Sequence, residues 1–309
     1  MMPSRFRLFS GSAHPRLAKA VAERLGADLA GCEVDRFPDG ELSVRLLDSV
    51  RGCSVYLIQP TSPPVNDHLM ELLAFADACR RAAAAAVTVI VPYFGYSRSD
   101  KRHGRREPIT ASMVGRLIEA VGVDHLVTID IHTIQTEGFF AIPVDTLTAV
   151  PTICSAIADD LPPDTVVVAP DAGRVVLATA YAERLHLPLA VLHKRRTNAH
   201  ETETTHLVGD VDGMTCLIID DMISTGGTIV QSAKALQGAG ARACRVAATH
   251  GLMLDGARER LEAAGIESVV VTDTVPVNEG GILRVASVAD LLSKLVQKLG
   301  EGSSLRELY

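Results

Sequence analysis

The chain has 309 residues, a length that suggests about two domains of ordinary size. Hydrophobic residues make up 47% and charged residues 22% of the sequence, a balance that excludes a disordered or collagen-like chain. The formal net charge of −7 argues against a nucleic-acid partner held by bulk electrostatics, so any bound anion has to be met by local basic residues.

The first half of the chain alternates short β-branched runs with amphipathic stretches rich in Ala and Leu. This pattern predicts strands over 5–10, 53–59, 87–93 and 125–132, and helices over 16–25, 67–86 and 110–120. The second half predicts strands over 165–171, 189–196, 215–221, 243–250 and 268–274, and helices over 173–185 and 229–237.

Strands that alternate with helices in this order form parallel sheets, and such sheets bind ligands at the carboxyl ends of their strands. The two halves look alike, which predicts two similar α/β domains with a boundary near 145–151. The six cysteines show no metal or haem spacing. The sequence begins without the apolar stretch of a signal peptide and contains no membrane span, so we expect a reduced, cytoplasmic protein with no membrane contact.

The most specific motif is LIIDDMISTGGTI over 217–229, in which an apolar strand leads into two carboxylates, a small polar turn and a helix. Asp220 and Asp221 can accept hydrogen bonds from sugar hydroxyls. Glycines in the turn let backbone N–H groups approach an anion, and the helix offers its positive end. The motif predicts a phosphate cradle beside a diol clamp, and an ordinary helix N-cap is the alternative. The cradle residues are Ser224, Thr225, Gly226, Gly227 and Thr228.

This loop resembles the phosphoribosyl-diphosphate-binding loop of type I phosphoribosyltransferases, and the rest of the chain is similar to the ribose-phosphate pyrophosphokinase family. The matching segments keep the family's order over nearly the whole chain: FPDGE (37–41), NDHLMELL (66–73), PYFGYSRSDKRHGRREPITA (92–111), IDIH (129–132), APDAG (169–173), HKRR (193–196), GDVDG (209–213) and the loop itself.

The resemblance implies two type I phosphoribosyltransferase-like domains, each with a mainly parallel sheet flanked by helices. They are expected over 1–147 and 148–286, with the C-terminal helical segment 287–309 packed back on the first domain. The implied reaction, part of nucleotide biosynthesis, transfers the diphosphoryl group of Mg-ATP to the 1-hydroxyl of ribose 5-phosphate. Its products are 5-phosphoribosyl 1-diphosphate and AMP.

The resemblance also implies site residues. Lys194 and Arg196 match the catalytic pair, whose positive charge would stabilise the transferring diphosphoryl group, although by themselves they would suit a solvated strand end. His132 and Asp171 match magnesium-coordinating positions. Because Mg²⁺ prefers oxygen ligands and keeps waters, we favour His132 acting through water.

The nucleotide site implied by the family is shared between subunits, in a homo-oligomer that is dimer-based or hexameric. Phe37, Asp39, Gly40 and Glu41 would reach into a neighbouring subunit and read adenine. Arg98, Ser99, Asp100 and His103 would hold the nucleotide from their own subunit. Without the resemblance, the first segment would be a surface turn, and the basic run over 98–106 a solvated loop or a funnel for polyphosphate.

The chain departs from the family pattern at several positions. Ser99 stands where the family usually has Gln, Arg174 where Gly is common, and Ser224 where an acid is usual. A serine lacks the paired amide groups of Gln, so we expect looser discrimination between nucleotides. The alternatives to a full synthetase are a catalytically weak regulatory paralogue and a phosphoribosyltransferase that consumes the same diphosphate.

Overall fold

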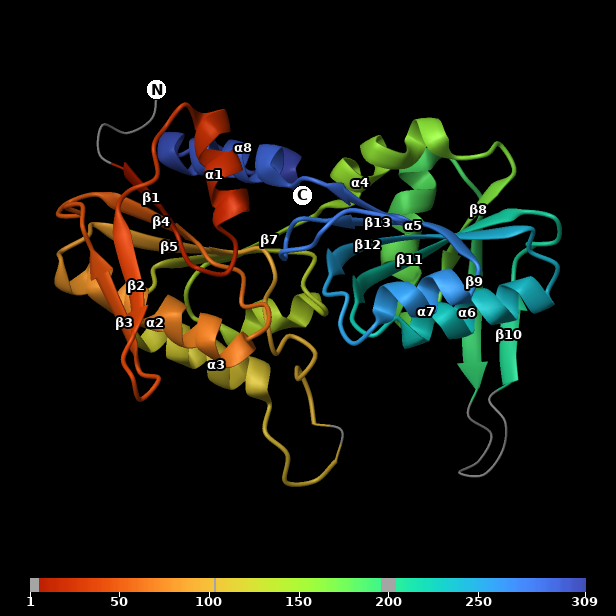
Figure 1. Cartoon of the computed structure of the whole chain (residues 1–309), viewed down its shortest axis with the longest axis horizontal. Helices are drawn as coiled ribbons and strands as arrows, with labels where there is room; N and C mark the ends of the chain where they lie inside the picture. Colours follow the sequence, from red (N-terminus) through yellow and green to blue (C-terminus); the bar gives the residue numbers. More distant parts are fainter. Residues whose placement is uncertain (1–5, 103, 196–203) are drawn as a thin grey trace. The chain divides into compact units, whose positions relative to one another are not determined.

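The structure is a computed structural model that describes residues 6–102, 104–195 and 204–309 (Figure 1). The chain forms two compact units. Unit 1 consists of Met1–Thr148, Thr274–Pro276 and Val288–Tyr309, and unit 2 consists of Ala149–Asp273 and Val277–Ser287. The chain therefore returns to unit 1 after unit 2 is complete.

Unit 1 is built on a parallel sheet of five strands in the order β1-β4-β5-β6-β7. Strands buried on both faces are nearly continuous apolar runs, and AVTVIV of β5 is an example, with five of its six residues buried. The strands are β1 (Phe6–Ser10), β4 (Ser54–Ile58), β5 (Ala86–Val91), β6 (His125–Ile129) and β7 (Val144–Leu147).

Two pairs of helices cover the two faces of this sheet (Figure 1). One pair is α1 (Pro15–Leu25) and α8 (Ala289–Glu301), which contact each other, and the other is α2 (Val65–Arg81) and α3 (Thr110–Ala120). Short 3-10 turns are η1 (Ile134–Phe139) and η4 (Arg306–Leu308). No helix in the described parts of either unit is long and apolar enough to cross a membrane.

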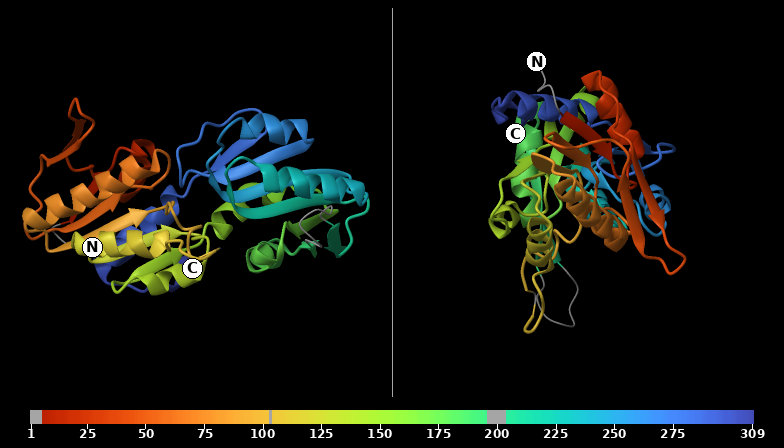
Figure 2. Two further views of the ribbon diagram at one scale, coloured as in Figure 1. Left: turned by 90° about the horizontal axis from the view of Figure 1, so that it is seen from below. Right: turned by 90° about the vertical axis from the view of Figure 1, so that its left-hand side faces the viewer.

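A separate antiparallel hairpin belongs to unit 1 and was not expected from the sequence. Its strands are β2 (Cys32–Arg36) and β3 (Leu42–Leu46), and β3 contacts α2. Gly40 closes the turn with a φ of 93°, a left-handed conformation that suits glycine. The hairpin extends away from the five-stranded sheet (Figure 2).

Unit 2 contains a seven-stranded sheet in the order β10-β9-β8-β11-β12-β13-β14, in which only β10 is antiparallel to its neighbour. Helices α4 and α5 cover one face, and α6 and α7 cover the other (Figure 1). The strands are β8 (Thr165–Ala169), β9 (Leu189–Arg195), β10 (Thr204–Val208), β11 (Thr215–Ile223), β12 (Ala243–Gly251), β13 (Ile266–Thr272) and β14 (Leu283–Ala286). The helices are α4 (Val150–Ile157), α5 (Val175–Leu185), α6 (Gly227–Gly238) and α7 (Ala257–Ala263), with 3-10 turns η2 (Ala158–Asp160) and η3 (Ala172–Arg174).

Several element ends differ from those expected. The strand predicted over 125–132 stops at Ile129, because Asp130 adopts a left-handed φ of 40°. Strand β11 runs past its expected end at 221 to Ile223, since it keeps its pairing with β12 to that point. The helix predicted to reach 86 ends at Arg81, before a turn in which Ala83 has a φ of 61°.

All six cysteines are free. Five are buried and Cys32 is half-buried, and each unit holds three of them. Burial raises the pKa of the Cys79 and Cys216 thiols to about 12, so both stay protonated at neutral pH and are poor nucleophiles.

Candidate functional site

The predicted cradle lies in unit 2, where β11 passes into α6. Gly226 is the N-cap of α6 with a left-handed φ of 78°, and no side chain among the described residues caps this helix. The first N–H groups of a helix have no partner within it, so this end is suited to an anion. The loop is fixed from behind: the backbone N–H of Leu254 donates to the carbonyl of Ser224 (2.9 Å), and Arg260 Nε donates to that of Thr225 (3.0 Å).

Asp220 and Asp221 are both buried and lie inside β11 rather than after it. Arg174 contacts both: its Nε lies 3.2 Å from Asp220 Oδ1, and its Nη2 lies 3.3 Å from Asp221 Oδ2. Burial, together with the neighbouring Asp221, raises the pKa of Asp220 to about 8, and the positive charge of Arg174 opposes that rise. Arg174 therefore offsets part of the cost of burying two adjacent acids.

The turn after β8 positions this arginine. Pairing between β8 and β11 ends at Val168 and Ile218, and β11 continues beyond it to the two acids. After β8 the chain enters η3. There Asp171 Oδ1 accepts a hydrogen bond from the Gly173 N–H (2.8 Å), and the Asp171 carbonyl accepts one from the Arg174 N–H (3.2 Å). Arg174 departs from the family pattern in the sequence, and its contact with Asp220 and Asp221 was not predicted.

Unit 1 has a cavity of about 510 Å³ at the ends of β5 and α2. It is lined by Val65, Asn66, Tyr93, Tyr96, Arg98 and Ser99. The Tyr96 hydroxyl donates to Asn66 Oδ1 across this lining, and Tyr96 has a left-handed φ of 66°. Aromatic walls with a few polar groups and one arginine are typical of a small-molecule pocket. Two of the predicted nucleotide residues, Arg98 and Ser99, therefore share one cavity.

Ser99 also supports the start of α3, a role that was not predicted. Its hydroxyl accepts a hydrogen bond from the Thr110 N–H (3.4 Å) and its carbonyl accepts one from the Ala111 N–H (3.2 Å), at the start of α3. Asp100, next along the chain, accepts from the Thr133 hydroxyl (2.8 Å), beside His132. The basic stretch is thus attached to the end of β6, and half-buried His132 lies at that attachment.

The four predicted adenine-reading residues form the tip of the β2–β3 hairpin. Phe37 is 53% exposed although it is aromatic, and Asp39 and Glu41 are exposed as well. The turn is closed by hydrogen bonds from the Phe37 N–H to the Glu41 carbonyl (2.8 Å) and from the Glu41 N–H to Asp39 Oδ1 (3.1 Å). No tip residue lines the 510 Å³ cavity of unit 1.

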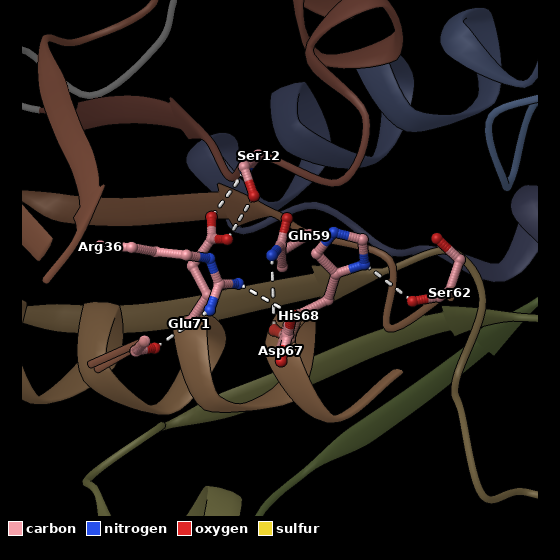
Figure 3. A network of polar contacts seen from close by, with 8 residues as sticks. Ser12, Arg36, Gln59, Ser62, Asp67, His68 and Glu71 are labelled. Carbon is pink, nitrogen blue, oxygen red and sulfur yellow. Dashed lines mark hydrogen bonds and ion pairs between the residues drawn. The ribbon is translucent and has the colours of Figure 1, made fainter. Parts of the chain in front are cut away.

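A polar network ties α2 to its surroundings (Figure 3). Glu71 is only 2% exposed and accepts hydrogen bonds from the N–H (2.6 Å) and the hydroxyl of Ser12, in the loop after β1. Gln59 Oε1 accepts from the Ala13 N–H (3.1 Å), and His68 Nδ1 lies 2.7 Å from the Ser62 carbonyl. These contacts connect α2 with the loops after β1 and β4.

Arg196 and His103 lie outside the described residues. Lys194 lies in β9, where its backbone pairs with Thr205 of β10. The structure describes no cluster of three or more His, Cys, Asp or Glu residues that could hold a metal, within the ranges given above. Asp171 offers carboxylate oxygens, which suit Mg²⁺, whereas His132 offers nitrogen, which does not. Asp171 is therefore the better fit to Mg²⁺ by its donor chemistry.

Comparison with known proteins identifies close relatives. Residues 6–122 match the family model for the N-terminal domain of ribose phosphate pyrophosphokinase, and residues 199–309 match that of the phosphoribosyl synthetase-associated domain. A ribose-phosphate pyrophosphokinase of Caldanaerobacter subterraneus subsp. tengcongensis is 44% identical over 98% of this chain and 97% of its own length. A ribose-phosphate pyrophosphokinase of Staphylococcus epidermidis is 40% identical over 99% of this chain and 97% of its own length.

A solved structure agrees with these relatives. The crystal structure of phosphoribosylpyrophosphate synthetase from Mycobacterium smegmatis superposes with a TM-score of 0.90 at 40% identity, over 97% of this chain and 100% of that one. This match confirms the predicted α/β class with mainly parallel sheets flanked by helices.

Proposed function

The chain belongs to the ribose-phosphate pyrophosphokinase family, and from this premise we propose that it makes 5-phosphoribosyl 1-diphosphate and AMP from ribose 5-phosphate and Mg-ATP. The observation that carries the proposal is the continuous segment from Asp220 to Thr228. Within it, two buried carboxylates adjoin an uncapped helix N-terminus with a left-handed glycine. This segment offers acceptors for a sugar diol and donors for a phosphate.

Ribose 5-phosphate binds at this segment. Gly227 and Thr228 are exposed at the helix end, where their N–H groups can receive the 5-phosphate. The hydroxyls of Ser224, Thr225 and Thr228 add donors. Asp220 and Asp221 accept hydrogen bonds from the ring hydroxyls. The sugar is thereby fixed at its phosphate and at its diol, which leaves the 1-hydroxyl to react.

ATP binds at the cavity of unit 1. Tyr93 and Tyr96 supply aromatic surface for a base, and exposed Arg98 supplies positive charge for phosphates. Phe37, Asp39, Gly40 and Glu41 complete the pocket of a neighbouring copy. Support for this comes from the exposed phenyl ring at the hairpin tip and from the absence of tip residues among the described cavity lining. The functional form is then a homo-oligomer.

The chemical step is attack of the ribose 1-hydroxyl oxygen on the β-phosphorus of ATP. The bond from that phosphorus to the bridging oxygen of AMP breaks, and the hydroxyl proton passes to solvent. Lys194 and Arg196 stabilise the negative charge on the transferring group, because such transfers depend on positioning and fixed positive charge. Mg²⁺, when bound with the phosphates, supplies further charge neutralisation, and Asp171 is the residue best suited to hold it.

The chain works in a reducing compartment such as the cytoplasm. Support comes from its six free cysteines, since oxidising compartments favour disulfides in proteins that carry several thiols.

The test is to incubate the protein with ribose 5-phosphate and Mg-ATP and to identify the products by phosphorus NMR. AMP and a 1-diphosphate are expected in equal amounts, and Lys194→Ala should lower kcat by about 100-fold with little change in KM. Formation of ADP would contradict the proposal. No turnover with intact substrate binding would favour the regulatory paralogue, and release of diphosphate from added 5-phosphoribosyl 1-diphosphate and a base would favour a phosphoribosyltransferase.

A further inference from the structure

The guanidinium of Arg174 contacts both Asp220 and Asp221, and we call this two-point contact the clamp. Two different nitrogens of one guanidinium reach two different acids, at 3.2 Å for Asp220 and 3.3 Å for Asp221. The side chain is only 15% exposed, and the side chains of the two acids are 12% and 5% exposed. A fixed planar guanidinium that spans both carboxylates determines their orientation as well as their charge.

The arrangement allows two opposite functions. Arg174 could compete with the sugar for the carboxylates, as a latch that the substrate must displace. Alternatively, it could stay in place and prepare the carboxylates for the sugar. Displacement would leave two adjacent acids buried beside each other without this positive charge, and would leave the half-buried guanidinium without these partners, which is costly on both sides. A carboxylate accepts about four hydrogen bonds, so two acids held by one arginine can still accept from hydroxyls.

We propose that Arg174 is a positioning residue for ribose 5-phosphate, which compensates the charge of Asp220 and Asp221 and orients both for the vicinal hydroxyls of the sugar. The inference rests on the proposed function and deepens it. It makes the site selective for a diol, because an oriented acceptor pair loses most when one hydroxyl is missing. The backbone of η3 supports this role, since hydrogen bonds to Asp171 fix the turn that carries Arg174.

The experiment compares Arg174→Met with Arg174→Lys. Steady-state kinetics give KM for ribose 5-phosphate, for 2-deoxyribose 5-phosphate and for ATP, and calorimetry gives the binding of ribose 5-phosphate without ATP. Arg284→Met is the matched control, since Arg284 forms an exposed ion pair with Asp160 in the same unit. Thermal unfolding of each variant shows whether it is folded.

For Arg174→Met we expect a rise of about 10-fold in KM for ribose 5-phosphate, the scale of one lost interaction with a charged group, and an ATP KM within about 2-fold of wild type. The preference for ribose 5-phosphate over its 2-deoxy analogue should fall. For Arg174→Lys, KM for ribose 5-phosphate and the preference over the 2-deoxy analogue should lie between the values of wild type and of Arg174→Met. The reason is that an ammonium cannot span both acids as a guanidinium does. Arg284→Met should behave as wild type.

A lower KM for ribose 5-phosphate in Arg174→Met would establish the latch and overturn the proposal, and an unchanged preference for the diol would overturn it too. If Arg174→Met does not fold, Arg174→Lys tests the proposal instead. A wild-type KM for ribose 5-phosphate and a wild-type preference over the 2-deoxy analogue in that variant would contradict the clamp. A wild-type protein that forms no AMP would refute the proposed function instead. Calorimetry on the same proteins would still show whether Arg174 supports sugar-phosphate binding.

Discussion

Arg36 Nη2 lies 2.9 Å from Asp67 Oδ2, and this ion pair joins the β2–β3 hairpin to the start of α2 (Figure 3). Arg36 directly precedes the hairpin tip, and Asp67 directly follows Asn66 of the cavity lining. The pair therefore connects the segment proposed to serve a neighbour's nucleotide with the residues that form the chain's own pocket.

Arg36→Met should raise KM for ATP and should lower the free energy of unfolding only slightly. Both side chains are nearly half exposed, so the pair contributes at most about 1 kcal/mol to stability. We expect KM for ATP to rise several-fold, with KM for ribose 5-phosphate unchanged, when the hairpin loses this attachment. The charge-reversed double variant Arg36→Asp with Asp67→Arg should recover part of the loss. Equal changes in both KM values would show that the ion pair acts only on the fold.

Replacing Glu71 should mainly destabilise the protein. Glu71→Leu removes the buried carboxylate that accepts hydrogen bonds from the N–H and the hydroxyl of Ser12, and hydrogen bonds to a charged group contribute about 1.5–3 kcal/mol. Glu71→Gln keeps an oxygen for that N–H and should cost clearly less. Urea denaturation of the two variants beside Ser12→Ala measures the difference. The same midpoint for Leu and Gln at position 71 would mean that Ser12 finds another partner.

The two glycines of the cradle should separate folding from binding. A Cβ at Gly227 would meet only Thr225 Oγ1, at 3.9 Å, so Gly227→Val should unfold at nearly the wild-type temperature. Its side chain would nevertheless obstruct the open helix end, and ribose 5-phosphate should bind at least about 10-fold more weakly by calorimetry. Gly226→Ala, at a φ of 78°, should instead lose about 1 kcal/mol or more of stability. Wild-type binding by Gly227→Val would remove the helix end from the sugar-phosphate site.

The raised pKa of Asp220 predicts how stability depends on pH. Its value of about 8 in the folded chain lies above the ordinary 3.8, so the folded state loses stability as pH rises from about 4 through 8. Asp220→Asn removes this loss, and its Tm relative to wild type should increase from pH 5 to pH 8. Asp164→Asn is the control, because the hydrogen bond with Arg242 lowers the pKa of Asp164 and the acid stays ionised above pH 5. The difference in Tm between Asp164→Asn and wild type should therefore stay constant from pH 5 to pH 8. A constant difference for Asp220→Asn would show that the acid is ionised throughout.

A shared nucleotide site should allow two inactive variants to restore activity together. Glu41→Ala and Lys194→Ala should each be nearly inactive as homo-oligomers. In a symmetric dimer with one chain of each kind, one site receives an intact Glu41 and keeps an intact Lys194, and the other carries both defects. Mixing with subunit exchange should restore about half of the wild-type activity per mixed dimer. No recovery after demonstrated exchange would mean that the hairpin serves its own chain.

The sequence predicted the buried strands well, because parallel strands covered on both faces are continuous apolar runs. The β2–β3 hairpin escaped prediction, since CEVDR and LSVRL mix polar and apolar residues and stay half exposed. The strand, turn and helix that carry Asp220, Asp221 and the proposed phosphate cradle were predictable because these residues are neighbours in the sequence.

Asn66 and Tyr96 meet only through the order of the strands, and Arg174 reaches Asp220 only because β8 and β11 are adjacent. Spacing along the chain carries no information about such contacts. The family resemblance therefore assigns Arg98 and Ser99 to a nucleotide site, whereas the other residues that line the same cavity were not predicted.

The three-segment composition of unit 1 has a consequence for synthesis. All residues of unit 2 lie between 149 and 287, whereas unit 1 also needs Val288–Tyr309. On the ribosome, unit 2 therefore has its whole sequence available first, although unit 1 begins the chain. Until α8 emerges, α1 lacks one of the elements that it packs against, although β1 is already present. The unit that is translated first is thus the last to complete its core, and a nascent chain stalled before residue 288 would expose apolar surface to chaperones.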